Sequence, residues 1–283
     1  MAPRSAPTAR RLRIGAELRR MRERAGMTAT EAARTLGTTQ GQMSNIEANR
    51  FGVNADRIRT LARIYGCTDQ RLVDALTDMA EDRTKGWWEE YREILPSPHL
   101  DLAEMEHHAT ALRVAQVINI PGLLQTPDHA RALFAEAVPA LRPHEAEHRI
   151  SYRVKRQVVL FRDRPVPYTA VIHEAALRMQ FGGRDVTRSQ LRHLVAVGEQ
   201  SNVTLRVIPF DGTSFPTAGH GIDYAHGPVT ALDTAQLDTS YGGELIDSEA
   251  KLDTYRQVLD RMEQATLKPA ASRDLIHRIA NDI

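Results

Sequence analysis

The sequence predicts an α+β protein in which an all-α domain of five helices is followed by a mixed α/β domain. Three observations support this prediction. Up to Gly66, short segments with helical spacing of apolar residues follow one another, and glycines separate most of them. After residue 160, strand-like alternation is interleaved with helical segments. The chain has 283 residues, which exceeds one small domain, so two units are expected.

The first two helices are defined by spacing and by their ends. The first is predicted over residues 13–25 from apolar residues at helical spacing, namely Ile14, Leu18, Met21 and Ala25, and it ends at Gly26. Thr28 and Glu31 have the spacing of a capping box, which opens a short second helix. Gly37 is expected to end that helix.

Two further helices follow, and a fifth is predicted in a longer helical segment. Thr39 is expected to cap a helix over 40–48 that buries Met43 and Ile46, and Asn54 to cap another that ends at Gly66. Residues 69–95 also have a helical pattern. Two short helices joined by a tight turn inside a bundle form a helix-turn-helix.

The helix over 40–48 carries short hydrogen-bonding side chains on one side: Gln40, Gln42, Ser44 and Asn45. In a helix-turn-helix the second helix of the pair enters the DNA major groove, where amide side chains can pair with base edges. The helix N-terminus also offers free N–H groups to a phosphate. The alternative is an ordinary solvated polar face, but spacing, caps and local charge together favour DNA reading.

Charge is distributed unevenly along the chain. Residues 1–65 contain 13 Arg against five acidic residues, a net charge of +8, so the rest carries −7 within a total of +1. A basic first domain indicates a polyanionic partner, and an acidic second domain indicates a different one.

Residues 14–66 resemble the Cro/C1-type (XRE) helix-turn-helix family through "LRRMRERAGMT" and "EAARTLGTTQGQMSNIEANR". The resemblance implies base contacts by Gln40, Gln42 and Asn45. It implies phosphate contacts by a second set: Thr28, Arg34, Thr39, Ser44 and Arg50. It also implies a largely buried ion pair between Arg22 and Glu47. The family usually has Gln where this chain has Ala29, so additional affinity is expected from Arg10, Arg11 and Arg13 in the N-terminal arm.

The second domain is predicted to be mixed. Helices are expected at about 102–114, 143–161, 248–265 and 271–280. Three more are expected: one that starts near Pro127, one that ends at Gly182, and one that runs from a Thr187–Gln190 capping box to residue 199. Strands are expected at 168–172, 203–207, 221–226, 229–234 and 236–240, with the first two able to pair in parallel. The proline-containing "LPSPH" at 95–99 is the linker candidate. The expected boundaries are 1–13 (basic arm), 14–80 (helix-turn-helix), 81–100 (connector) and 101–283 (effector and dimerisation domain).

This second domain resembles the DUF5753 domain through "IPGLLQTPDHARALF", "RVKRQ" and "HEAALRMQFGG". The resemblance implies a WhiJ-like, antitoxin-like actinobacterial regulator that binds a small DUF397-like protein and affects development and antibiotic production in Streptomyces relatives. Homodimerisation is expected because one small helix-turn-helix makes few base contacts.

Candidate partner or ligand residues in the rest of the chain are Trp87, Trp88, Arg149, Arg153 and Arg156. The tryptophans, with Tyr91, are expected to join the two domains or to form an exposed patch. The arginines are expected to hold an anionic ligand, to bind a partner's carboxylates or to pair with nearby Glu.

No catalytic, metal or cofactor site is predicted. "HEAAL" has Leu177 where a zincin helix requires its second His, and phosphate-loop and dinucleotide fingerprints are missing. Glu104 with His108, and His220 with Asp223 and His226, are weak metal candidates. An enzyme with a DNA-binding head, a small-molecule-responsive regulator and a strict antitoxin remain the alternatives.

Membrane insertion, secretion and disulfide bonding are not expected. No apolar run approaches the roughly 18 residues of a membrane span, and "MAPRSAPTARRLR" is not followed by the apolar stretch of a secretory signal. Cys67 is the only cysteine, which excludes an intrachain disulfide. We therefore expect a cytoplasmic protein.

Overall fold

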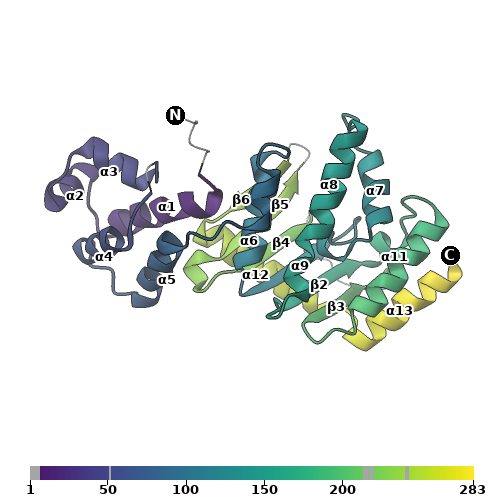
Figure 1. Cartoon of the computed structure of the whole chain (residues 1–283). Coiled ribbons are helices and arrows are strands. Elements are labelled where there is room, and N and C mark those ends of the chain that lie inside the picture. Colours follow the sequence, from purple (N-terminus) through teal and green to yellow (C-terminus); the bar gives the residue numbers. More distant parts are fainter. Residues whose placement is uncertain (1–6, 51, 213–215, 217–219, 240–241) are drawn as a thin grey trace. The chain divides into compact units, whose positions relative to one another are not determined.

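The computed structural model describes residues 7–50, 52–212, 216, 220–239 and 242–283. The chain divides into two compact units, Met1–Glu89 and Glu90–Ile283, whose elements are shown in Figure 1. The division falls inside the segment 81–100 that was expected to be a connector. Residues 1–6 of the expected basic arm lie outside the described residues. Within the described part of the chain, no helix has the length and apolar character of a membrane span.

The first unit is all-α, as predicted, and contains five helices: α1 (Ala9–Arg24), α2 (Ala29–Leu36), α3 (Gln40–Glu47), α4 (Ala55–Ile64) and α5 (Gln70–Glu81). Its core is formed by side chains that are at most 2% exposed, among them Ile14, Leu18, Met43, Ile58 and Leu76. Ile14, Leu18 and Met43 are among the apolar positions that predicted the helices, whereas Ile46, also expected to be buried, is half-buried.

The predicted helix caps are confirmed. Thr28 and Glu31 form a capping box at the start of α2, and Thr39 forms one with Gln42 at the start of α3. The Asn54 side chain accepts a hydrogen bond from the Arg57 N–H at the start of α4. Gly37 ends α2 with a φ of +71°, a conformation that glycine adopts without strain. Local chemistry therefore sets the ends of the two helices that form the helix-turn-helix.

Two boundaries in the first unit differ from prediction. Helix α1 begins at Ala9 instead of residue 13, and an ion pair of 2.6 Å joins its buried Arg13 to Glu17. The helical segment predicted over 69–95 ends at Glu81, because the Asp82 side chain accepts from the Thr84 N–H and competes with helical bonding.

The second unit is built on one mixed six-stranded sheet with the order β3-β2-β1-β4-β5-β6. The strands are β1 (Ala111–Gln116), β2 (Tyr168–His173), β3 (Val203–Ile208), β4 (Ile222–His226), β5 (Thr234–Thr239) and β6 (Gly242–Ile246). β1, β2 and β3 are parallel neighbours, which confirms the predicted parallel pairing of β2 with β3. The pairings of β4 with β1 and β5, and of β5 with β6, are antiparallel.

Helices cover both faces of this sheet (Figure 1). They are α6 (Ser97–His108), α7 (Pro127–Ala135), α8 (Pro143–Arg156), α9 (Val158–Phe161), α10 (Glu174–Arg178), α11 (Arg184–Val197), α12 (Glu249–Gln264) and α13 (Pro269–Asp282), with 3-10 turns η1 (Trp87–Tyr91), η2 (Gly122–Leu124) and η3 (Thr230–Leu232). One core, which includes Val114 and Ala170, contains residues of α10, α11 and α13. The other contains Leu259 and Met262 of α12.

Several predictions in the second unit are wrong at particular places. The linker candidate 95–99 contains the start of α6, because Pro98 fits the first turn of a helix. The helix predicted over 102–114 ends at His108, and residues 111–116 instead form β1 between β2 and β4. The strand predicted over 229–234 contains η3, and β6 was not predicted. Pairing with neighbouring strands outweighs local propensity in such short segments.

The capping box predicted from Thr187 and Gln190 is also absent. Both residues lie inside α11, which begins at Arg184 after Gly183. The Gln190 amide donates to the Leu124 carbonyl and accepts from the Thr126 N–H, each at 2.7 Å. It therefore ties α11 to the turn that precedes α7.

Candidate nucleic-acid interface

Helix α3 exposes the polar side that the sequence predicted. Gln40, Gln42 and Ser44 are exposed and Asn45 is half-buried, whereas Met43 on the opposite side is fully buried. Packing of Met43 against the core fixes which side of the short helix faces outward. The outward side of α3 therefore consists of short side chains that can donate and accept hydrogen bonds.

The three amides on this side differ in their availability. The Gln42 oxygen accepts from the Thr38 hydroxyl and, at 3.3 Å, from the Thr39 N–H. The Asn45 oxygen accepts from the Arg50 guanidinium at 3.3 Å. For Gln40, no hydrogen bond is recorded within the described part of the chain. Gln40 is therefore the amide that can offer both a donor and an acceptor to a base without breaking an existing bond.

A buried ion pair positions the end of α3 against α1. The Arg22 guanidinium donates to both carboxylate oxygens of Glu47, at 2.5 and 3.0 Å, and to the Met27 carbonyl at 2.7 Å. The two charged side chains are only 9% and 10% exposed. Because α3 is only eight residues long, an anchor at its last residue constrains the direction of the whole helix.

Two further contacts hold α3 close to α1. A Cβ atom at Gly15 would overlap the backbone carbonyl of Glu47, so glycine is required for this approach. The Asn49 side chain, just beyond α3, donates to the Arg11 carbonyl. Near these contacts, burial together with the Glu47 charge raises the pKa of Tyr65 to about 12, so its hydroxyl stays protonated.

The expected phosphate-contacting residues are all exposed: Thr28, Arg34, Thr39, Ser44 and Arg50. The Thr28 hydroxyl already donates to Glu31 and accepts from the Glu31 N–H, so its capping box competes with a phosphate. Of the arm residues expected to add affinity, Arg13 is paired with Glu17 and Arg10 lies 3.5 Å from Asp82. These pairs reduce the positive charge that the arm presents.

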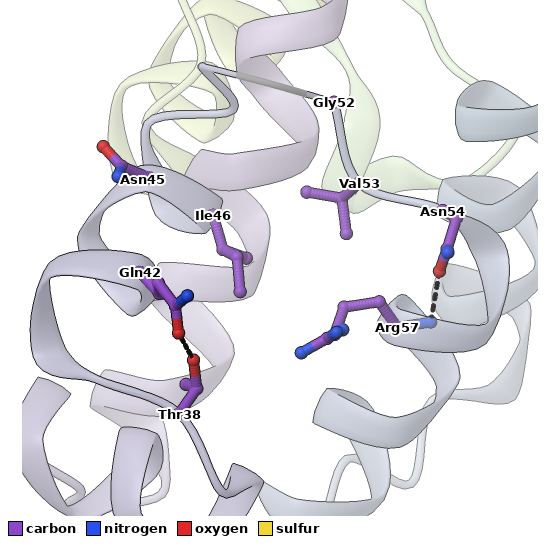
Figure 2. Close-up of a pocket in the computed structure, with 8 residues that line it drawn as sticks. All are labelled: Thr38, Gln42, Asn45, Ile46, Gly52, Val53, Asn54 and Arg57. Carbon is purple, nitrogen blue, oxygen red and sulfur yellow. Dashed lines mark hydrogen bonds between the residues drawn. The ribbon is translucent and has the colours of Figure 1, made fainter.

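A hollow of about 520 Å³ lies between α3 and the start of α4. In Figure 2 the side chains of Ile46, Val53 and Arg57 point into it, beside Gln42. Arg57 was missed by the sequence analysis. The sequence did contain a signal for this residue, because Arg57 lies in the first turn of the helix that Asn54 caps, directly after the helix-turn-helix. Its guanidinium adds positive charge next to the exposed amides.

The other candidate binding residues are placed differently. Trp88 is 2% exposed and Arg156 is 6% exposed, so neither forms part of an exposed patch. Arg156 donates to both carboxylate oxygens of Glu106, at 2.8 and 2.5 Å, and Arg153 donates to Gln125 at 2.7 Å. Trp87 and Arg149 are half-buried. Of the described residues, no group of three or more His, Cys, Asp or Glu is arranged to hold a metal ion.

Comparison with known families agrees with the division of the chain into two units. A family described as a helix-turn-helix domain matches residues 13–76. A family described as a domain of unknown function, DUF5753, matches residues 100–278, which is more than half of the chain. The chain belongs to the DUF5753 family. No curated protein and no solved structure matches it.

These matches confirm both family resemblances seen in the sequence. The helix-turn-helix match covers most of α1, all of α2 to α4 and the first part of α5, and it supports a DNA-binding regulator rather than an enzyme. The DUF5753 match covers the six-stranded sheet and most of its helices, without naming a ligand or a partner.

Proposed function

We propose that this DUF5753 protein is a cytoplasmic, sequence-specific transcriptional regulator that binds its operator as a homodimer. Helix α3 enters the major groove, with Gln40, Gln42 and Asn45 reading base edges. Thr28, Arg34, Thr39, Ser44 and Arg50 contact phosphates and set the register of the protein on the duplex. The observation that carries the proposal is the outward polar side of α3, supported by caps at both helix starts and by the Arg22–Glu47 anchor.

The second unit is proposed to dimerise and to receive the regulatory signal from a small DUF397-like protein, in the manner of an antitoxin. The support is the resemblance, together with the opposite charges of the two parts of the sequence. Light scattering of the purified full chain tests dimerisation. Affinity purification from the native host, with mass spectrometry and DNA sequencing of one sample, tests the partner. Recovery of a promoter without a small protein would contradict the partner proposal.

Gln40→Ala is expected to weaken binding to the operator by about 1–3 kcal/mol and to relax base preference at one position. The reason is loss of the amide on α3 that is free to offer a donor and an acceptor. The measurement is fluorescence anisotropy with an operator duplex, selected from random sequences, and with a scrambled duplex. Gln264→Ala, on the exposed side of α12, is the matched control and should behave as the wild type. An equal loss on both duplexes would contradict base reading by Gln40.

Arg50→Ala is expected to weaken binding to operator and scrambled DNA by similar factors. A phosphate contact carries no sequence information, and its loss lowers the slope of log affinity against log salt by about one. Titrations at several salt concentrations measure the slope, and Arg278→Ala, an exposed position on α13, provides the control. A selective loss on the operator would instead place Arg50 at a base.

A further inference from the structure

A polar cluster lies on one face of the sheet in the second unit, where apolar residues would be expected. Asp223 of β4 pairs with Val114 on one side and Gln236 on the other, and Asp238 lies two residues beyond Gln236 on β5. Residues two apart on a strand share a face. Asp223, Gln236 and Asp238 therefore continue the face whose core contains Val114. We call these three residues, with Gln116 and Tyr168, the β4–β5 polar cluster.

Two glycines make room for the amides of this cluster. A Cβ at Gly221 would lie 2.7 Å from the Gln116 amide, and a Cβ at Gly243 would lie 2.8 Å from the Gln236 amide nitrogen. Gly243 is also the direct pairing partner of Asp238. The amide side chains thus lie across strands that have no side chain at those points. The cluster is built into the sheet by these small residues.

The carboxylate of Asp223 is not satisfied by its neighbours. No hydrogen bond or ion pair to Asp223 is recorded among the residues that the structure describes. Arg156 is held by Glu106 in a two-bonded ion pair, and Arg153 donates to Gln125. The neighbouring Asp238 accepts from Gln236 at 3.1 Å and repels Asp223. The half-buried Asp223 therefore has an acceptor to offer, beside a second carboxylate.

An independent observation points to the same place. Tyr168 of β2 is 2% exposed, and its hydroxyl has no hydrogen-bond partner among the residues that the structure describes. Tyr168 lies on the same face of the sheet as Asp223, by the register of β2 and β4 on β1. Burial raises the pKa of Tyr168 well above its usual value, and the charges of Asp223 and Glu106 add to the rise. A buried hydroxyl without a partner is destabilising unless something else bonds to it. The Tyr168 oxygen and the Asp223 carboxylate therefore both have room to accept a hydrogen bond, and one donor group can serve both.

We propose that the β4–β5 polar cluster binds the ammonium group of a small primary amine. An ammonium has three N–H donors and no acceptor, so it can donate to Asp223 together with either Asp238 or the Tyr168 oxygen. Its positive charge also offsets the repulsion between the two carboxylates. Around the cluster, the three carboxylates of Asp223, Asp238 and Glu106 face the two guanidinium groups of Arg153 and Arg156, so the local charge favours a cation over an anion. The site gives the second unit a chemical input that is independent of DNA binding and of any protein partner.

Titration calorimetry of the full chain tests the proposal directly. The probes are ethanolamine, putrescine and agmatine, and the control compounds are 1,4-butanediol, which has the same chain length as putrescine without charge, and succinate. At least one amine is expected to bind with one-to-one stoichiometry, and neither control compound is expected to bind. A chain that binds none of the three amines, or binds butanediol equally well, would overturn the proposal, because water then suffices for the cluster.

Asp223→Asn is expected to weaken amine binding by at least about tenfold, since it keeps the shape of the side chain and removes the charge. Asp185→Asn is the matched control, because the Asp185 side chain is 96% exposed on α11. Circular dichroism and thermal melting establish that both variants fold. If Asp223→Asn folds and binds the amine like the wild type, the site lies elsewhere and the assignment is wrong.

The pH dependence of binding gives a second readout. Burial raises the pKa of Asp223 to about 7, and repulsion from Asp238 adds to the rise. The charged and titratable groups that surround it are Asp238 on β5, Glu106 on α6, Arg153 and Arg156 on α8, and Tyr168 on β2. Amine affinity should rise about tenfold from pH 6 to pH 8 as Asp223 loses its proton. In Asp223→Asn this rise should disappear, and its persistence would contradict the assignment.

Discussion

Replacing Glu106 by glutamine is expected to lower the free energy of unfolding of the second unit by about 3–5 kcal/mol. Glu106 and Arg156 are each 6% exposed, and their two hydrogen bonds measure 2.5 and 2.8 Å. The variant keeps the shape of the side chain but leaves the Arg156 charge buried without a counterion. Burial lowers the pKa of Arg156, and the Glu106 charge raises it again. Urea denaturation, followed by circular dichroism, measures the change.

The matched control is an exposed ion pair made by α8, the helix that carries Arg156. Lys155 of α8 lies 2.5 Å from Glu90, but their side chains are 37% and 66% exposed. Glu90→Gln is therefore expected to change stability by at most about 1 kcal/mol. The double variant Glu106→Gln with Arg156→Gln should lose less than the two single variants added together. Equal effects of Glu106→Gln and Glu90→Gln would show that burial does not set the strength of these pairs.

Replacing Glu47 by glutamine is expected to destabilise the first unit by about 3 kcal/mol, and also to weaken operator binding. The variant leaves the guanidinium of Arg22 buried at 9% exposure, with the exposed Glu23 carboxylate 3.8 Å away in place of the Glu47 charge. It also removes the contact that fixes the end of α3 against α1. Denaturation measures the first effect. Binding at a temperature where the variant remains folded measures the second.

Glu23→Gln is the control for Glu47. The Arg19–Glu23 pair is 2.8 Å long but half or more exposed at both side chains, so its loss should cost little. A Glu47→Gln variant with the stability and operator affinity of Glu23→Gln would mean that the ion pair does not position α3. If Glu47→Gln loses stability but the folded variant binds the operator as tightly as the wild type, the Arg22–Glu47 pair has only a structural role.

The first unit could be predicted closely because its signals are local. Thr28, Thr39 and Asn54 cap the helices that follow them, and Gly37 adopts the conformation that ends α2. Each of these features depends on residues within one helical turn. The polar side of α3 follows from the same local spacing, since burial of Met43 determines which residues face outward.

The errors in the second unit arise from contacts between distant parts of the chain. Residues 111–114 were assigned to the end of a helix, yet residues 111–116 form β1 because β2 and β4 pair with both of its edges. The Gln190 amide bonds a turn 64 and 66 residues away, which no local capping pattern reveals. Glu106 and Arg156 are 50 residues apart in sequence. The β4–β5 polar cluster likewise depends on strand register, which the sequence analysis did not assign.

The central claim is that α3 reads DNA sequence, and selection from random duplexes tests it most directly. The full chain and its Gln40→Ala variant are each incubated with a library of random duplexes, and the bound DNA is sequenced. We predict that the wild type enriches a discrete motif of two inverted half-sites, with centres about 10 base pairs apart or a multiple of that spacing. Gln40→Ala should lose preference at one base pair in each half-site and keep the rest. Enrichment of no motif by the wild type, or of an identical motif by the variant, would contradict the account.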